Sequence, residues 1–263
     1  DTLTPAGLGV FVDNLVISGM PFRKVYLPLL RRDPTPTVTI NPCTSDNCAN
    51  FEPGTVSASY WCSSDNTDWA AGITQIGGDG GNSSYYLKAK TPGFMWAVSP
   101  RSSLKTPKSN FRVNADFSFL RMQSSLPLSN YKEAAFGMLL NVNGTPFDDA
   151  DKCLYRGGEA GSGIGFFRFL IWVKSDGSGY KTQFTRWENG VEPDYQDPKV
   201  DLPAGVTINR TGWNQLQLEH QGTTLRAYIN GTKVNEWSNG WSEGYDLQWL
   251  GLFTRAGAGN PSD

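Results

Sequence analysis

The chain has 263 residues, of which 29 are glycine, 16 are proline, 13 % are aromatic and only 18 % are charged, with a formal net charge of −2. This length fits one large all-β domain or two small domains. A coiled coil would need more Ala, Glu, Lys and Leu, a disordered chain would lack the aromatics, and a nucleic-acid binder would normally show a basic excess. No run of 18 apolar residues occurs, so no membrane span is expected.

The chain begins at Asp1, without methionine or a charged-then-apolar leader. We therefore expect a removed export signal and an extracellular protein of a bacterial cell surface. Four cysteines suit two disulfides in that location: Cys43, Cys48, Cys62 and Cys153. Three connectivities are open, and the short loop favours Cys43 with Cys48, leaving Cys62 with Cys153. Zinc or free thiols are the alternative, although the chain has no C-x-x-C spacing.

The first predicted element is a strand over residues 9–18 that is apolar on both faces. Val10, Val12 and Val16 would point one way, and Phe11, Leu15 and Ile17 the other. Such a strand belongs inside a sheet. Residues 19–50 follow as an extended linker, with an apolar stretch at 24–30 and a part rich in Pro and Thr from residue 33.

The clearest strand lies over residues 111–119, where apolar residues alternate with polar ones from Phe111 to Phe119. Further strands are predicted over 136–142, 166–173, 180–188, 214–220, 224–229 and 247–254. Turn pairs such as Asn143-Gly144, Asn189-Gly190 and Asn230-Gly231 separate several of them. No segment shows a helical period, so the prediction is an antiparallel all-β sandwich.

Residues 51–263 resemble the concanavalin A-like, laminin-G-like jelly-roll superfamily. The motifs that carry the resemblance lie at 51–61, 110–113, 136–140, 165–169, 212–216, 228–231 and 250–253. In that family the last of these strands is followed by a loop and a closing strand. Here the chain stops in the loop, and a segment resembling the closing strand lies at the other end, over 10–17. The expected domains are a donor strand (1–18), a linker (19–50) and a jelly roll (51–263).

Three arrangements place this strand in a jelly roll: its own domain, the next subunit, or the preceding unit of a tandem array. We favour the next subunit, joined through Val10, Phe11, Val12, Leu15, Val16 and Ile17. Because each copy would give and receive a strand, the expected partners are other copies in a head-to-tail homopolymer.

Catalysis is not expected. Glucanases of this superfamily need two carboxylates on one strand, and the E-x-D-x-x-E pattern is missing here. Glu159, Glu188, Glu192, Glu219 and Glu243 are scattered in turns or strand ends. The single histidine, His220, is interpreted as a surface hairpin residue rather than a general base.

Structural calcium is a further expectation, although no cofactor is certain. The resemblance implies that the closing-strand Asp13 pairs with Glu52 around such an ion, and Asp148, Asp149 and Asp151 form a second acidic cluster. Solvated acidic turns are the alternative for both sets, and the one that we favour. Asn82, Asn143, Asn209 and Asn230 lie in glycosylation sequons, several of which coincide with turn motifs.

Sugar binding is the main alternative to a role as a filament subunit. Trp187, Trp237 and Trp241 lie in or beside polar turns and could stack on glycans, or they could pack on the sandwich. The first hypothesis is therefore a non-catalytic filament or surface-array subunit joined by strand donation. The alternative is a carbohydrate-binding, lectin-like module of a secreted protein. A third hypothesis is a glycan hydrolase whose carboxylates come from distant loops.

Overall fold

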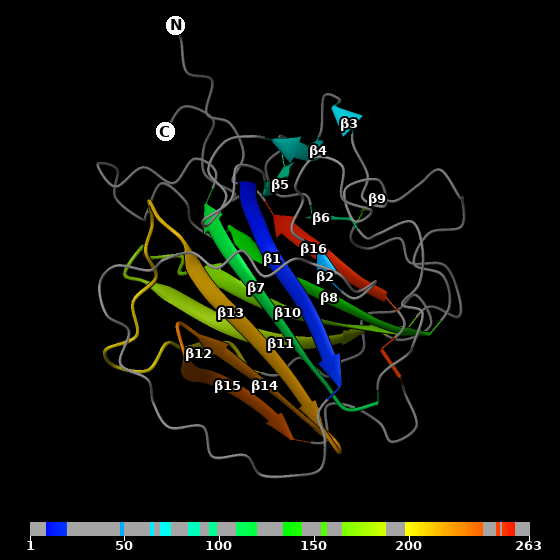
Figure 1. Cartoon of the computed structure of the whole chain (residues 1–263). Coiled ribbons are helices and arrows are strands. Elements are labelled where there is room, and N and C mark those ends of the chain that lie inside the picture. Colours follow the sequence, from blue (N-terminus) through cyan, green and yellow to red (C-terminus); the bar gives the residue numbers. More distant parts are fainter. Residues whose placement is uncertain are drawn as a thin grey trace, which may run out of the picture.

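The computed structural model describes residues 9–19, 48–49, 64–65, 69–74, 84–89, 95–98, 109–119, 134–143, 154–156, 165–187, 198–238, 246–247 and 249–255. Every regular element in these ranges is a β-strand, and all strand pairs are antiparallel. The strands form two sheets that stack face to face (Figure 1). The predicted antiparallel β-sandwich is confirmed.

The nine-stranded sheet forms the front layer in Figure 1. Its order is β15 (Thr232–Ser238), β14 (Thr224–Ile229), β13 (Asn214–Gln221), β7 (Phe111–Phe119), β1 (Gly9–Gly19), β5 (Ser84–Ala89), β4 (Trp69–Thr74) and β3 (Ser64–Asp65), with β2 (Cys48–Ala49) beside β1.

The seven-stranded sheet lies behind it. Its order is β12 (Val200–Asp201), β11 (Tyr180–Trp187), β10 (Gly165–Val173), β8 (Ala135–Asn143), β16 (Trp249–Arg255), β6 (Met95–Val98) and β9 (Leu154–Arg156). At the centre of this sheet β8 approaches β10 closely. A β-carbon on Gly137 would lie 1.8 Å from the carbonyl oxygen of Phe169, so only glycine fits there.

The core fills the space between the two sheets and is rich in aromatic rings. Phe117 of the front sheet packs on Phe136 of the rear sheet with ring centroids 5.0 Å apart. Phe169 and Phe184 pack on each other at 5.1 Å, and all four rings are fully buried. Burial of several Phe side chains, at about 1.5–3 kcal/mol each, is a major source of the sandwich's stability.

Strand β1 lies inside its own sheet, between β7 and β5. Val12 pairs with Phe117 on one side and with Tyr85 on the other. Within this single chain β1 pairs with its own domain, and insertion into a neighbouring subunit, the arrangement we favoured, stays a prediction. A strand tethered to its own domain stays at high effective concentration beside its slot, which favours self-insertion. That β1 is the family's closing strand stays a prediction.

The faces of β1 also differ from the prediction. The register shifts between Asp13 and Val16, which marks a β-bulge. As a result Val12 and Leu15 are both buried, whereas strict alternation would place them on opposite faces. Val16 pairs with Asn114 and is half-buried. The side chains of Val10, Phe11 and Ile17 lie outside the described residues.

Most of the predicted strands are found within two residues of their expected ends. Strand β15 was missed, because a bulge beside Tyr228 breaks its alternation and buries both Val234 and Asn235. The turn before it is Asn230-Gly231, whose φ angles of 50° and 79° suit a tight hairpin.

Several predictions lie outside the described residues. Of the linker over 19–50, only Gly19 and β2 are described, and the division into three domains stays a prediction. Cys48 pairs with Val16 in β2, while Cys43, Cys62 and Cys153 are not described, so the disulfides also stay predictions. No helix able to cross a membrane occurs in the part of the chain that the structure describes.

Candidate functional site

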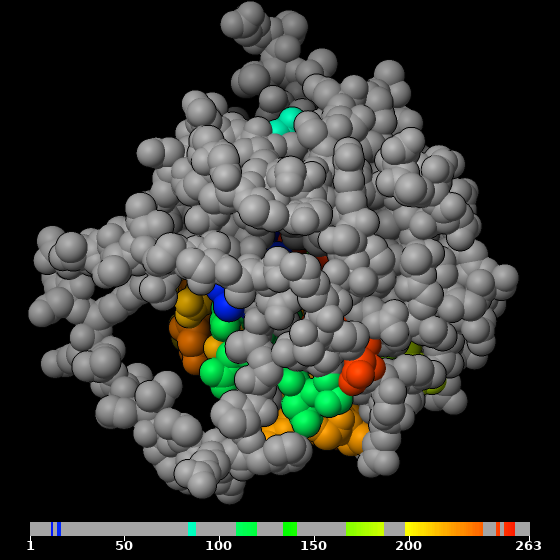
Figure 2. Space-filling model, turned by 45° about the vertical axis from the view of Figure 1, so that its right-hand side comes forward, coloured from blue at the N-terminus to red at the C-terminus, as the bar shows by residue number. Residues whose placement is uncertain are grey.

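A polar surface covers the outer side of the nine-stranded sheet over β7, β13, β14 and β15. Apolar residues of these strands point into the core, and the residues between them point outward. The outward set, called here the polar face, consists of Arg112, Asn114, Gln217, Glu219, Arg226, Tyr228, Lys233 and Glu236. Figure 2 shows residues of 109–119 in green beside orange residues of the C-terminal strands on one side of the molecule.

Strand register arranges the polar face in two parallel rows. One row runs from Arg112 through Glu219 and Arg226 to Glu236, so positive and negative side chains alternate. The second row runs from Asn114 through Gln217 and Tyr228 to Lys233. Neighbouring members of a row are separated by the strand spacing of about 4.8 Å. The result is a regular grid of hydrogen-bonding groups.

Glu219 holds the centre of the grid in place. Its Oε1 accepts from Arg112 Nη2 at 2.7 Å and from Gln217 Nε2 at 2.9 Å, and its Oε2 accepts from the Tyr228 hydroxyl at 3.2 Å. The Glu219 side chain is 12 % exposed, against 39 % for Arg112. The carboxylate therefore lies beneath the donors that it fixes, and those donors remain at the surface.

A second carboxylate organises the outer end of the grid. Glu236 Oε2 accepts from Arg226 Nε at 2.8 Å and from Lys233 Nζ at 3.1 Å. Hydrogen bonds from Lys233 and then Arg226 lower the pKa of Glu236. Burial, followed by the nearby Glu219 charge, raises the pKa of Tyr228, so its hydroxyl keeps its proton at neutral pH.

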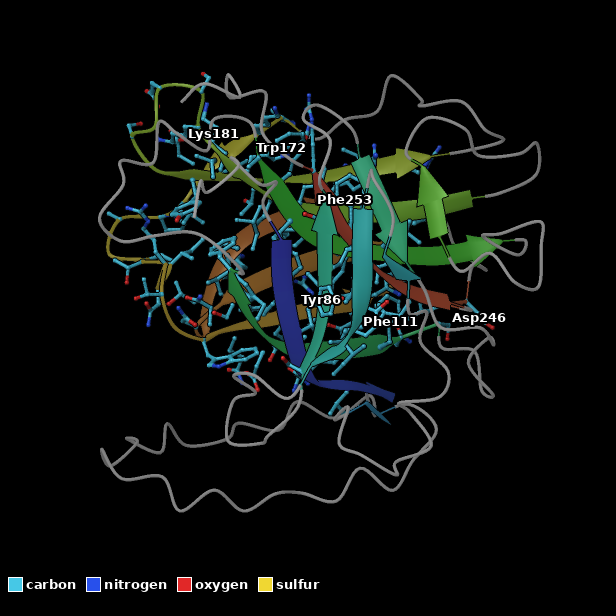
Figure 3. The ribbon with its side chains drawn as sticks, turned by 90° about the horizontal axis from the view of Figure 1, so that it is seen from above. Tyr86, Phe111, Trp172, Lys181, Asp246 and Phe253 are labelled. Atoms are coloured by element: carbon cyan, nitrogen blue, oxygen red, sulfur yellow. The ribbon has the colours of Figure 1, made fainter. Side chains whose placement is uncertain are left out.

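The outer side of the seven-stranded sheet carries a different cluster, centred on Trp172. Lys199 Nζ lies 3.9 Å and Arg255 Cζ 5.4 Å from the Trp172 ring centroid, and Trp172 Nε1 donates to Gln183 Oε1 at 3.1 Å. Trp172 is only 6 % exposed, so its ring cannot serve as an open stacking surface. Figure 3 shows Trp172 next to Lys181, its partner on β11.

Arg168 lies on the same side and is also buried. Its Nε donates to Thr185 Oγ1 at 2.9 Å, and its Cζ lies 5.5 Å from the ring centroid of the fully buried Phe253. Among the described residues, the outer side of this sheet is therefore packed, whereas the polar face is accessible. The polar face is the better candidate for binding a ligand.

The candidate stacking tryptophans differ in position. Trp237 lies on β15 and packs at the edge of the core, with its ring centroid 6.1 Å from that of Phe167 and 6.2 Å from that of Phe184. This is the packing role that we had set against sugar stacking. Trp187 ends β11, where its backbone pairs with Phe166, and its side chain is not described. Trp241 lies outside the described residues.

The calcium candidates are mostly outside the described ranges, which include only Asp13. Asp13 pairs with Asp116 across β1 and β7. Glu52, Asp148, Asp149 and Asp151 are not described. Within the described ranges, no three metal-ligating side chains form a group.

His220 is not a surface residue, contrary to the prediction. It is 2 % exposed, its ring packs on Phe111 at 5.3 Å, and its Nδ1 contacts the carbonyl oxygen of Ser109. Burial lowers its pKa below the ordinary value. His220 is buried because side chains alternate between the two faces of β13, and His220 lies on the inward face with Leu216 and Leu218.

Two glycosylation candidates are fully described. Asn209 lies in the loop before β13, and Asn230 in the turn after β14. Both are exposed, but their side chains make different contacts. Asn143 ends β8 without a described side chain, and Asn82 lies outside the described residues.

Sequence reasoning did not identify the polar face. The alternation in β7 showed that Arg112 and Asn114 point away from the core, which was the available signal. The rows form only when β7, β13, β14 and β15 are placed in register, and β15 had not been predicted. Glu219, interpreted as part of a scattered set, is the centre of this network.

No protein-family model matches the chain, and no curated protein matches it. Among solved structures, it is similar to the kappa-carrageenase from Pseudoalteromonas carrageenovora, at 12 % identity and a TM-score of 0.37 over 68 % of this chain and 58 % of that one. It is also similar to CG-16, a homodimeric agglutinin from chicken liver (11 %, TM-score 0.31, over 63 % of this chain and 87 % of that one). The carbohydrate binding module CBM66 from Bacillus subtilis is similar at 11 % sequence identity and a TM-score of 0.25, over 63 % of this chain and 96 % of that one. These likenesses concern the β-sandwich fold alone.

Proposed function

We propose that the protein is a non-catalytic carbohydrate-binding module whose site is the polar face. The observation that carries the proposal is the pair of rows in which amide, guanidinium, carboxylate and phenol groups stand at regular spacing on rigid strands. Sugar hydroxyls both donate and accept hydrogen bonds, so a surface that offers both kinds of group at fixed positions suits them.

The internal hydrogen bonds of the polar face favour binding. Arg112, Gln217 and Tyr228 are already fixed by Glu219, so little side-chain freedom is lost when a ligand binds. Arg112 and Lys233 keep further N–H groups that can donate to a sugar oxygen. The Tyr228 ring adds an apolar surface beside these polar groups.

The same contacts support binding without turnover. Glycosidic hydrolysis uses a carboxylic acid with a raised pKa beside a second carboxylate. Glu236 shows the opposite, because Lys233 and Arg226 lower its pKa. Glu219 is held by three donors as a structural acceptor. We place the module outside the cell, as the sequence predicts.

The test is a glycan array at neutral pH with the wild type and three variants of the chain. Gln217→Ala and Tyr228→Phe each remove hydrogen-bonding groups from the polar face, and each should weaken binding about tenfold. Lys181→Ala, on the other sheet, is the control and should bind as the wild type does. If the wild type binds no glycan, or binds equally well in both polar-face variants, the proposal is wrong.

A second candidate is the filament subunit, and one observation favours it. Without β1, β7 and β5 would have no strand between them, so the nine-stranded sheet would be divided in two. We propose that a copy can fill this slot in another copy when the chain is concentrated. Size-exclusion chromatography of the chain lacking residues 1–18 tests this. A truncated monomer as stable as the full chain, or a full chain that is strictly monomeric at high concentration, would exclude strand donation.

A further inference from the structure

Three asparagines meet where the loop before β13 contacts the turn after β14. Asn214, which is buried, lies at the centre: its Nδ2 donates to the Asn209 carbonyl at 2.8 Å, and its Oδ1 accepts from the Asn209 backbone N–H at 2.7 Å. The backbone of Asn209 is therefore fixed on both its polar groups. The third member, Asn230, donates to Asn214 Oδ1 at 3.3 Å.

The side chain of Asn209, unlike its backbone, makes no hydrogen bond to Asn214 or Asn230. Its Oδ1 accepts from the Thr211 N–H at 3.2 Å, and within the described ranges its Nδ2 donates to no acceptor. One side of the amide lies against Gly212, where a β-carbon would come within 2.3 Å of Nδ2. Asn209 as a whole is nevertheless exposed. Asn209 thus combines a fixed backbone with an exposed side chain whose Nδ2 makes no hydrogen bond to the described residues.

Asn230 shows the reverse arrangement. Its Nδ2 donates to the Thr207 carbonyl at 3.1 Å as well as to Asn214, and its Oδ1 accepts from the Gln215 N–H at 2.9 Å. Both amide hydrogens are used inside the protein. A sugar on Nδ2 would replace one of them and break the junction that ties the loop to the hairpin.

We propose that Asn209 is the N-glycosylation site of this region, and that Asn230, despite its matching sequon, carries no glycan in the folded protein. The Asn209-Arg210-Thr211 sequon lies in an exposed loop, as such a site requires. The inference rests on the contacts of Asn209 and Asn230 and does not depend on the proposed sugar-binding function.

The modification is a glycosyl transfer from an oligosaccharide carried on a lipid diphosphate. A bond forms between Asn209 Nδ2 and the anomeric carbon of the first sugar. The bond from that carbon to the diphosphate oxygen breaks, and the lipid diphosphate leaves with the electron pair. Nδ2 gives up one proton to a base of the transferase, and its second hydrogen remains.

The experiment is secretion of the full chain from a host that performs N-glycosylation, followed by glycopeptide mass spectrometry of the folded, monomeric fraction. Thr211→Ala destroys the Asn209 sequon and leaves the Asn209 side chain in place, whereas Thr211→Ser keeps the sequon. Thr232→Ala does the same for Asn230. Peptide-level analysis separates these two sites from Asn82 and Asn143.

We expect a glycan on Asn209 in the wild type, in Thr211→Ser and in Thr232→Ala, and its complete loss in Thr211→Ala. Equal melting temperatures for the two Thr211 variants, both produced in a host without N-glycosylation, will show that the loss reflects the sequon rather than misfolding. A glycan on Asn230 in folded wild-type protein would overturn the inference. So would an unmodified Asn209 in cells that glycosylate a second, co-expressed glycoprotein.

Discussion

The outer sides of the two sheets differ in what they leave accessible. On the nine-stranded sheet, β7 alternates strictly between buried apolar and half-buried polar residues, and its outward side chains join the polar face. On the seven-stranded sheet, Arg168, Leu170 and Trp172 of β10 point outward and are all less than a tenth exposed. Alternation of apolar and polar residues is typical of a strand in a sheet with one solvent-exposed face. A nearly continuous apolar run is typical of a strand in a sheet that is covered on both faces. Among the described residues, one outer side of the sandwich is thus partly accessible to solvent and the other is packed.

The strongest test of this difference is Phe253→Ala on the packed side. Phe253 is fully buried beneath Arg168, so the truncation should cost about 3–5 kcal/mol of unfolding free energy. Asn114→Ala, on the polar face, should change it by less than about 0.5 kcal/mol. Urea unfolding measures both. Similar costs at the two positions would mean that the sides do not differ as described.

Next in size is Glu219→Gln, which removes the charge at the centre of the polar face. The side chains of Arg112, Gln217 and Tyr228 lose a charged acceptor, so the free energy of unfolding should fall by about 1–2 kcal/mol. The effect is limited because Arg112 is partly exposed to solvent. The exposed Glu236→Gln is the matched control and should cost less than about 1 kcal/mol. Denaturant unfolding of both variants decides whether Glu219 organises the grid, a role that equal costs would refute.

The third prediction concerns pH and the buried end of β13. The folded-state pKa of His220 lies below its unfolded value of about 6.5, so the unfolded chain binds the proton more readily. The free energy of unfolding keeps its full value, as far as His220 is concerned, above the unfolded pKa. It decreases as pH falls from there through the folded pKa of His220, by up to about 1.4 kcal/mol per pH unit.

Thermal unfolding of the wild type and His220→Gln between pH 7 and pH 4.5 gives this contribution as a difference between the two proteins. The wild type should lose more stability on acidification than the variant does. Parallel pH profiles would show that His220 does not titrate on unfolding.

The smallest expected effect is that of Lys199→Ala. Lys199 is exposed and lies over Trp172, so the lost cation–π contact should cost about 0.5–1 kcal/mol. Lys199→Arg keeps the cation and should restore most of this stability. If the Lys199→Ala protein is as stable as the wild type, the contact between Lys199 and Trp172 does not stabilise the protein and the prediction is wrong.

The sequence predicted the parts of the fold that follow a simple period. Residues 111–119 were assigned correctly because every second side chain is buried, and 224–229 because apolar residues alternate between two turns. Bulges broke the period in β1 and β15, so Leu15 was placed on the wrong face and β15 was not found.

The candidate site was harder to predict, because it depends on register between strands that lie far apart in the chain. Arg112 and Glu219 are paired across β7 and β13, and nothing local to either residue indicates the other. His220 was misplaced for a related reason. It borders a turn, where polar residues are usually exposed, but its parity along β13 turns it toward Phe111.

The central position of β1 has a consequence for how the chain folds during synthesis. Val12 is synthesised well before its partners Tyr85 and Phe117. Until those partners are made, β1 has no neighbouring strands to pair with, and its apolar residues are accessible to other chains. Contacts between such distant residues slow folding and lengthen the period in which aggregation competes with it. The strand that completes the nine-stranded sheet is therefore also a segment that needs protection from aggregation while the protein is being made.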